Sequence, residues 1–220
     1  MPRISDKKPI SNYFTDILQR GYRLGRLPVY TQRSRNWYRE QAQNVSKNFD
    51  EERLMKTERD RFRGWPVPGK LYLFMYDPKL KDKLPYYDRL PLVFPISMSS
   101  DSFIGLNMHY LPHPLRAKLM DALYPYLSND QLDSTTQLQI SFKILKAVAR
   151  LAPYKPCVKK YLRTHVRSRF VLIDVKEWDI ALFLPLERFE KSTTRHVWAD
   201  STAAINKLKV SRARGFRSAR

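Results

Sequence analysis

The chain has 220 residues, of which 43% are hydrophobic, so its length allows one domain with long extensions or two small domains. Its formal net charge is +20, and its one cysteine, Cys157, excludes an internal disulfide. The sequence shows neither an apolar run long enough to span a bilayer nor a secretory leader, which predicts a protein that is made in a reducing cytosol and does not span a membrane.

The positive charge is concentrated in three segments. Residues 1–63 contain fifteen Lys and Arg against eight Asp and Glu, residues 134–173 contain nine and no acid, and residues 201–220 contain six and no acid. Clustered cations release condensed counterions from nucleic acid, so this distribution predicts contact with DNA phosphates. A solvated basic surface, or one that faces an acidic protein, is the alternative.

The chain divides into a basic N-terminal arm at residues 1–63, a core at residues 64–200 and a basic C-terminal tail at residues 201–220. Apolar residues in the arm are scattered, although residues 50–63 have the composition of a polar helix. Arms of this composition need partners in order to fold. We therefore expect both arms to make few contacts with the core of their own chain and to meet neighbours in a multi-subunit assembly.

The core begins with three predicted strands at residues 70–78, 91–98 and 103–111. Pro91 and Pro95 interrupt the second strand, which predicts a sheet edge or a bulge there. Three helices are predicted next, at residues 115–127, 138–151 and 157–166, and residues 170–175 form a fourth strand. This order predicts an α+β fold with a small, largely antiparallel sheet or barrel and two to three helices.

The acid-free segment supplies the candidate DNA-binding residues. On the predicted helices, its cations are expected to be exposed and to form one contiguous positive face. No recognition helix or zinc module is apparent, so contact is expected with phosphates and not with base edges. The candidate DNA-binding residues are Lys146, Arg150, Lys159, Lys160, Arg163 and Arg167.

Catalysis has weak support in the sequence. His109 could act with Asp77, Asp88 or Asp101 as an acid–base or Mg²⁺ site, but aspartates beside turns and a histidine in a strand are more often structural. Neither a metal-ligand spacing nor a phosphate-binding glycine loop is present. The sequence therefore predicts no enzyme activity, no metal and no cofactor.

Two tyrosines beside an arginine mark a second feature, the loop at residues 85–89. Tyr86 and Tyr87 could stack on bases at a DNA terminus. The alternative is that they clamp the loop to the core while Asp88 pairs with Arg89 or with a backbone donor.

The stretch GKLYLFMYDPKLKDKLPYYDRLPLVFPISMSSDSFIGLNMHYLPHPLRAKLMDALY at residues 69–124 resembles the DNA end protector family of large contractile-tailed (T-even-like) bacteriophages, and VRSRFVLIDVKEWDIALFLPLERF belongs to the same pattern. The resemblance implies a virion protein, made in the host bacterial cytoplasm, that shields packaged DNA ends from host exonuclease. It carries no functional-residue motif. The alternative is a structural component of the neck, tail or baseplate whose arms contact other phage structural proteins.

Overall fold

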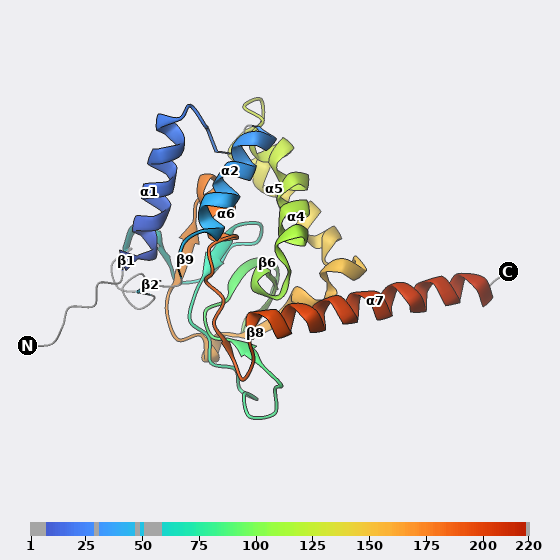
Figure 1. The fold of residues 1–220 in the computed structure, drawn as a ribbon. Coiled ribbons are helices and arrows are strands. Elements are labelled where there is room, and N and C mark those ends of the chain that lie inside the picture. The colour runs from blue at the N-terminus through green and yellow to red at the C-terminus, as the bar shows by residue number, and fades with distance from the viewer. Residues whose placement is uncertain (1–7, 29–30, 47–48, 51–58, 219–220) are drawn as a thin grey trace, which may run out of the picture.

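The computed structural model describes residues 8–28, 31–46, 49–50 and 59–218, and its centre is a six-stranded antiparallel sheet (Figure 1). In spatial order, the strands are β3 (Phe62–Arg63), β9 (Phe170–Ile173), β4 (Leu71–Leu73), β6 (Leu92–Met98), β7 (Ser102–Asn107) and β8 (Val158–Leu162). The predicted α+β class and antiparallel sheet are confirmed. The barrel alternative is wrong, because β3 and β8 are the two free edges of an open sheet.

The two prolines of the second predicted strand act in different ways. Pro91 precedes β6, and Pro95 lies where the register between β6 and β7 shifts. The predicted bulge is therefore confirmed. The edge alternative is wrong, since β6 lies between β4 and β7 and pairs with both.

More helices are present than the two or three predicted. The α-helices are α1 (Ile10–Arg23), α2 (Gln32–Gln43), α4 (His113–Leu127), α5 (Ser134–Val148), α6 (Trp178–Ala181) and α7 (Thr194–Ser218). Short 3₁₀ helices are η1 (Arg59–Arg61), η2 (Met108–Tyr110), η3 (Ala152–Cys157), η4 (Arg163–His165) and η5 (Val175–Glu177). Two small strand pairs complete the fold: β1 (Lys8–Pro9) with β2 (Phe49–Asp50), and β5 (Tyr87–Asp88) with β10 (Phe189–Glu190). The predicted polar helix at residues 50–63 lies largely outside the described residues.

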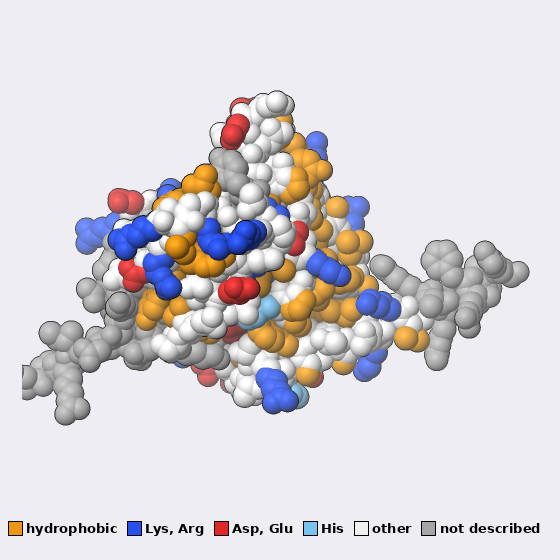
Figure 2. All heavy atoms as spheres, turned by 45° about the horizontal axis from the view of Figure 1, so that its top comes forward, with side chains coloured by type: hydrophobic (Ala, Val, Ile, Leu, Met, Phe, Trp, Pro, Cys, Tyr) orange, Lys and Arg blue, Asp and Glu red, His pale blue; other side chains and the backbone are white. Residues whose placement is uncertain are grey.

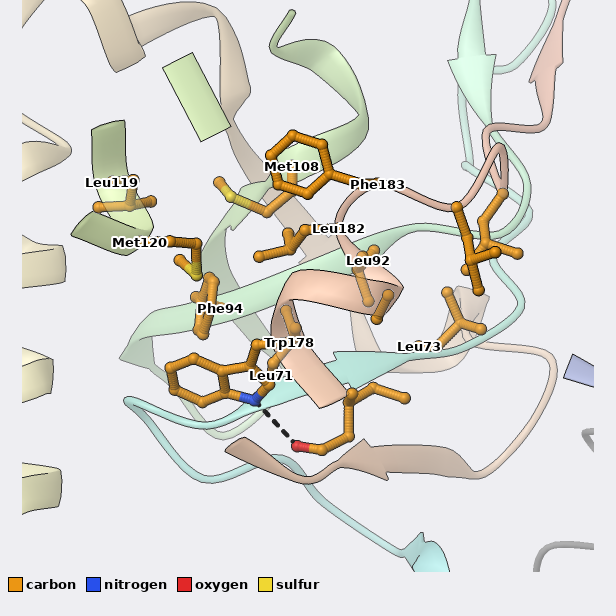
Figure 3. Packing of buried hydrophobic residues seen from close by; sticks show 14 of the residues in the cluster. Leu71, Leu73, Leu92, Phe94, Met108, Leu119, Met120, Trp178, Leu182 and Phe183 are labelled. Carbon is orange, nitrogen blue, oxygen red and sulfur yellow. Dashed lines mark hydrogen bonds between the residues drawn. The ribbon is translucent and has the colours of Figure 1, made fainter. Parts of the chain in front are cut away.

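The two faces of the sheet bury different kinds of side chain. One face packs aliphatic residues such as Leu71 and Leu92 against the helices, and Phe94 and Trp178 lie in the same core (Figure 3). The ring centroids of Phe94 and Trp178 are 4.9 Å apart. The other face carries a separate aromatic cluster, in which Phe74 is completely buried. The residues of this aromatic cluster are Tyr72, Phe74, Tyr76, Val93, Phe103, Tyr161 and Phe170.

The described part of the N-terminal arm belongs to the main core, so the expectation of few contacts is wrong there. In α1, the buried residues Ile10, Phe14, Ile17 and Leu18 recur at helical spacing and form one apolar face. Gly21 continues that face, and the ring of Tyr38 from α2 packs so closely on it that an added Cβ would lie 2.0 Å from the tyrosine oxygen.

A buried arginine fixes α2 to two later helices. Arg39 Nε donates to Asp179 of α6 at 2.7 Å, and its Nη2 donates to Asp121 of α4 at 2.8 Å. These partners are 140 and 82 residues away along the chain. The contacts therefore tie the N-terminal segment to the centre of the fold.

The helix predicted at residues 157–166 is replaced by strand β8 and the short helix η4. β8 pairs with β7, and the ring of Tyr161 stacks on Phe103 with centroids 5.1 Å apart. Pro156 precedes the strand, and a β-branched and an aromatic residue within it suit a pleated surface. The cross-strand stacking is the tertiary contact that overrides the helical pattern.

The predicted C-terminal tail is the distal part of a helix, α7. Val197, Ser201 and Ile205 are buried at intervals of four residues, and every residue from 206 to 211 is exposed. Beyond Ile205 the helix extends away from the body (Figure 1). Within the described residues, no helix combines the length and apolar character that a bilayer crossing requires.

Candidate nucleic-acid interface

A cavity of about 340 Å³ lies where the edge strand β8 meets the loop that carries β5. We call it the tyrosine–lysine cavity, because five tyrosines and two lysines contribute to its lining, together with prolines and polar groups. These seven residues are Tyr76, Tyr86, Tyr87, Tyr110, Lys159, Lys160 and Tyr161. The cavity brings together two features that lie more than 70 residues apart in the sequence.

The inner wall of the cavity is rigid. Tyr76 and Tyr161 meet edge to face with ring centroids 4.9 Å apart, and the backbone N–H of Leu162 donates to the Tyr76 hydroxyl at 3.2 Å. Tyr161 in turn stacks on Phe103 of the neighbouring strand. Aromatic pairs in these geometries are mutually stabilising, so the wall is preformed by the sheet.

The two lysines occupy consecutive positions of β8. Neighbouring residues of a strand point to opposite faces, but both reach this cavity because β8 is the edge strand. The ammonium of Lys159 lies 4.0 Å from the ring centroid of Tyr110, and burial lowers the pKa of this ammonium. Among the described residues, no carboxylate forms an ion pair with either lysine.

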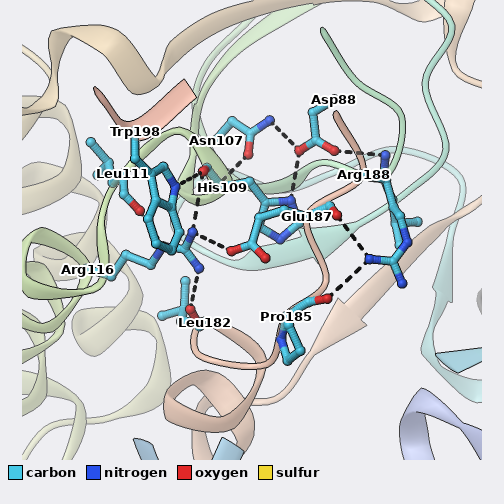
Figure 4. Close-up of polar contacts among 11 residues, drawn as sticks. Asp88, Asn107, His109, Leu111, Arg116, Leu182, Pro185, Glu187, Arg188 and Trp198 are labelled. Atoms are coloured by element: carbon cyan, nitrogen blue, oxygen red, sulfur yellow. Dashed lines mark hydrogen bonds and ion pairs between the residues drawn. The ribbon is translucent and has the colours of Figure 1, made fainter. Parts of the chain in front are cut away.

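The tyrosine loop is held in place by Asp88 at the base of the cavity. One carboxylate oxygen accepts from the backbone N–H of Leu90 at 3.1 Å. The other contacts Asn107 Nδ2 at 3.0 Å and His109 Nδ1 at 2.8 Å (Figure 4). β5 also pairs with β10, so the loop is anchored at its backbone as well. The structural alternative for Asp88 is confirmed, with Leu90 as its backbone donor.

The geometry does not favour catalysis by His109. Of its three candidate partners only Asp88 contacts it, and the histidine is completely buried. Asp77 instead pairs with Lys81 and Arg167, and Asp101 accepts from the Ser102 hydroxyl. A histidine without solvent access holds the strand end in place and cannot reach a substrate.

Behind the cavity, a buried arginine joins four parts of the chain. Arg116 of α4 donates to the carbonyls of Leu111 at 2.7 Å and Leu182 at 2.6 Å, and to the carboxylate of Glu187 at 2.6 Å. Its guanidinium also lies over the ring of Trp198 in α7 (Figure 4). Burial alone would raise the pKa of Glu187, but Arg116 outweighs it and holds that pKa at about 2.

The six candidate cations fall on different elements. The expectation that all of them lie on α-helices is wrong, because Lys159 and Lys160 belong to strand β8, whereas their forming one positive face stays a prediction. Lys146 and Arg150 lie on α5 and just beyond its end, and both are exposed. Arg163 follows β8, is exposed, and lies 5.0 Å above the ring of Trp65. Arg167 is also exposed but contacts Asp77 at 3.4 Å.

Lys160 is exposed as predicted. Lys159 is half-buried, so the prediction that it is exposed is wrong. The reason is that Lys159 packs along the Tyr110 ring at the sheet edge. On the face shown in Figure 2, Lys and Arg side chains are distributed among hydrophobic and acidic side chains and do not form one patch.

A neighbouring cavity of about 390 Å³ shares Tyr76 and Tyr87 with the tyrosine–lysine cavity. Its cations are paired: Arg89 contacts Glu190 at 3.0 Å, while Lys81 and Arg167 share Asp77. Three cations there face two carboxylates. The tyrosine–lysine cavity is therefore the better anion site of the two.

The sequence indicated the tyrosine loop and the lysines beside Tyr161 as two separate features. It did not indicate Tyr76 or Tyr110, nor that all of these residues form one site. Tyr76 follows β4, Tyr110 ends η2 and Tyr161 lies in β8. No local pattern signals that these rings converge, because their proximity depends on strand order.

The described part of the chain contains neither a candidate metal site nor a reactive thiol. No group of three or more His, Cys, Asp or Glu residues there could hold a metal ion. Burial raises the pKa of the Cys157 thiol to about 12, and the thiol donates to the Tyr154 carbonyl.

An aromatic cavity edged by unpaired lysines is typical of proteins that bind nucleic acid strands. The family model described as Phage T4 terminal DNA protecting protein matches residues 30–202. The chain therefore belongs to this family of phage DNA-protecting proteins, and the resemblance seen in the sequence is confirmed. The matched range begins before α2 and ends in α7, so it includes part of the predicted N-terminal arm. No curated protein and no solved structure matches the chain.

Proposed function

We propose that this protein associates with the virion, binds the ends of packaged DNA through sequence-independent phosphate contacts, and shields them from host exonuclease. Family membership supports the protective role. The observation that carries the mode of contact is the pair Lys159 and Lys160 at an aromatic cavity, two cations that have no carboxylate partner among the residues the structure describes. Phosphate oxygens are the counterpart that such lysines lack.

Protection of this kind needs no chemical step. An exonuclease must engage the terminal nucleotide, and a protein seated on the terminus excludes it by occupying the same space. No bond of the DNA has to break or form, so the buried His109–Asp88 pair needs no substrate access. The proposed function therefore requires neither enzyme activity nor a cofactor.

The remaining candidate cations extend the proposed contact. Arg163 lies a few residues beyond the cavity lysines, and Arg167 follows it along the chain, although Asp77 offsets part of its charge. Lys146 and Arg150 on and beyond α5 would contact DNA only if it bends around the body or if a second segment approaches. With on the order of five phosphates contacted, the logarithm of the binding constant should fall with log salt at a slope of about −4 to −5.

Exonuclease digestion of linear DNA tests the proposal, at a salt concentration high enough to suppress nonspecific coating. The double variant Lys159→Gln/Lys160→Gln should lose protection and show a shallower salt slope. A matched control, Lys118→Gln/Lys176→Gln, removes the same charge from exposed positions away from the cavity and should retain protection. Equal digestion with and without the wild-type protein would contradict end protection.

A second role, contact with other phage structural proteins, is favoured by the distal part of α7. Leu208 and Val210 are 38% and 50% exposed on a helix that projects from the body. Exposed apolar residues on a basic helix can pack against a neighbouring subunit. Particles assembled with a chain that ends at residue 205 should then contain less of this protein than particles assembled with the full chain. Equal incorporation would leave DNA as the only proposed partner.

A further inference from the structure

The size of the tyrosine–lysine cavity restricts what can enter it. At about 340 Å³ it is at the small end of ligand pockets, far too small for a DNA duplex but large enough for a single nucleotide. A nucleotide can enter only when it is unpaired. Unpairing costs a few kcal/mol inside a duplex, and least where a base is already single-stranded.

The tyrosines of the cavity differ in how much ring surface remains available. Tyr110 and Tyr161 are 6% and 4% exposed, because neighbouring rings already cover them. Tyr86 and Tyr87 are only half-buried. Tyr86 packs on the fixed wall, with its centroid 6.0 Å from Tyr110. A base would therefore stack on the loop tyrosines and not on the wall.

The electrostatics of the cavity favour an anion beside the base. Lys159 is half-buried, and its ammonium lies over the face of the Tyr110 ring. The one carboxylate in the lining, Asp88, has both oxygens occupied by hydrogen bonds from Leu90, Asn107 and His109. Asp88 is therefore engaged with these three groups and is not ion-paired with Lys159 or Lys160, so a phosphate can pair with the two lysines.

We propose that the tyrosine–lysine cavity holds one unpaired nucleotide at a DNA terminus, with its base stacked on Tyr87 and its phosphate at Lys159 and Lys160. This inference rests on the proposed end protection and explains how the protein would recognise a DNA end. Only a terminus supplies an unpaired nucleotide at a low free-energy cost, so the cavity distinguishes a terminus from internal duplex. Stacking on an aromatic ring tolerates every base, which fits sequence-independent binding.

Binding of labelled DNA, measured by fluorescence anisotropy, tests the inference on the full chain. Three ligands share one duplex sequence: a blunt duplex, a duplex with one unpaired terminal nucleotide, and the same overhang with an abasic residue in place of that nucleotide. The unpaired nucleotide should tighten binding about tenfold over the blunt end, and the abasic residue should abolish the gain. A covalently closed circular competitor should displace the overhang ligand poorly.

Variants test whether the tighter binding of the overhang depends on the cavity. Tyr87→Ala should remove most of the tenfold preference, while Tyr87→Phe should keep it because the ring remains. Tyr22→Ala, an exposed tyrosine on α1, is the matched control and should behave as wild type. Because the abasic ligand leaves the protein unchanged, the test does not depend on whether a variant folds.

The outcomes separate the two proposals. Equal binding of overhang, blunt and abasic ligands, combined with protection of linear DNA, would overturn the nucleotide pocket and leave end protection standing. Failure to bind or protect any linear DNA would overturn both. A preference for the overhang that survives Tyr87→Ala and the abasic substitution would also overturn the pocket.

Discussion

The N-terminal helices and the distal part of α7 are both basic segments of the same chain, but the former pack into the core and the latter projects from it. Residues 10–43 form two helices whose apolar faces join the main core, and Arg39 binds Asp179 inside it. In α7, burial ends at Ile205 and the following residues to 211 are exposed. Net charge therefore does not distinguish a folded segment from a projecting one. The periodicity of apolar residues does, because it decides whether a helix has a face to bury.

The largest expected effect comes from removing a core side chain of α1. Phe14→Ala should destabilise the protein by about 3–5 kcal/mol, since Phe14 is 1% exposed and its loss leaves a cavity. Tyr22→Ala on the same helix is the control: Tyr22 is 46% exposed, and its loss should cost less than about 0.5 kcal/mol. Chemical denaturation measures both. A Phe14→Ala loss as small as that of Tyr22→Ala would show that the segment is a dispensable arm after all.

Acid should weaken the contacts at the base of α7, where Arg116 lies over Trp198 and binds Glu187. The pKa of Glu187 is lowered in the folded protein to about 2. Its contribution is therefore present above the ordinary pKa near 4.5 and is lost as the pH falls towards 2. We expect this loss to amount to about 3 kcal/mol. Denaturation across this range should show it in the wild type. An unchanged pH dependence in Glu187→Gln would contradict the assignment.

A smaller effect is expected at the contact between α1 and α2. Gly21→Ala improves helix propensity but places a Cβ against the Tyr38 ring, so it should cost about 1–3 kcal/mol. Gly64→Ala is the control, because no atom of the described residues, apart from the chain neighbours of Gly64, lies within 4 Å of a Cβ there. Thermal melting compares the two. Stabilisation by Gly21→Ala would mean that the two helices do not pack as described.

The smallest expected effect on stability is that of deleting the projecting part of α7. A chain that ends at residue 206 loses six Lys and Arg, and residues 207 to 211 at the start of the deleted segment are exposed. Its free energy of unfolding should therefore change by less than about 1 kcal/mol. If these cations contact DNA, the salt dependence of DNA binding should become shallower. A cooperative loss of stability comparable to that of Phe14→Ala would remove the contrast between the two basic segments.

The α+β class, the antiparallel strand pairing and helices α4 and α5 could be predicted from the sequence, because each depends on a local period. Proline chemistry predicted a sheet edge or a bulge near Pro95, and the pairing of β6 on both sides left the bulge. The family was also readable from residues 69–124. The apolar spacing of Ile10, Phe14, Ile17 and Leu18 was present too, but the surrounding charge masked it. The helix predicted at residues 157–166 was wrong because the pairing of β8 with β7 overrides local propensity.

The candidate site could not be predicted from the sequence, because it depends on how distant segments pack. Tyr86, Tyr110 and Tyr161 come from a loop, a 3₁₀ helix and an edge strand, and their distances depend on the strand order around β7 and β8. Tertiary packing also decided that Lys159 is half-buried while Lys160 is exposed. Residue type predicts what a side chain can bind. Whether the side chain forms a site depends on which other side chains lie beside it and on how far it is buried. Both depend on chain segments that are distant in the sequence and meet only in the folded protein.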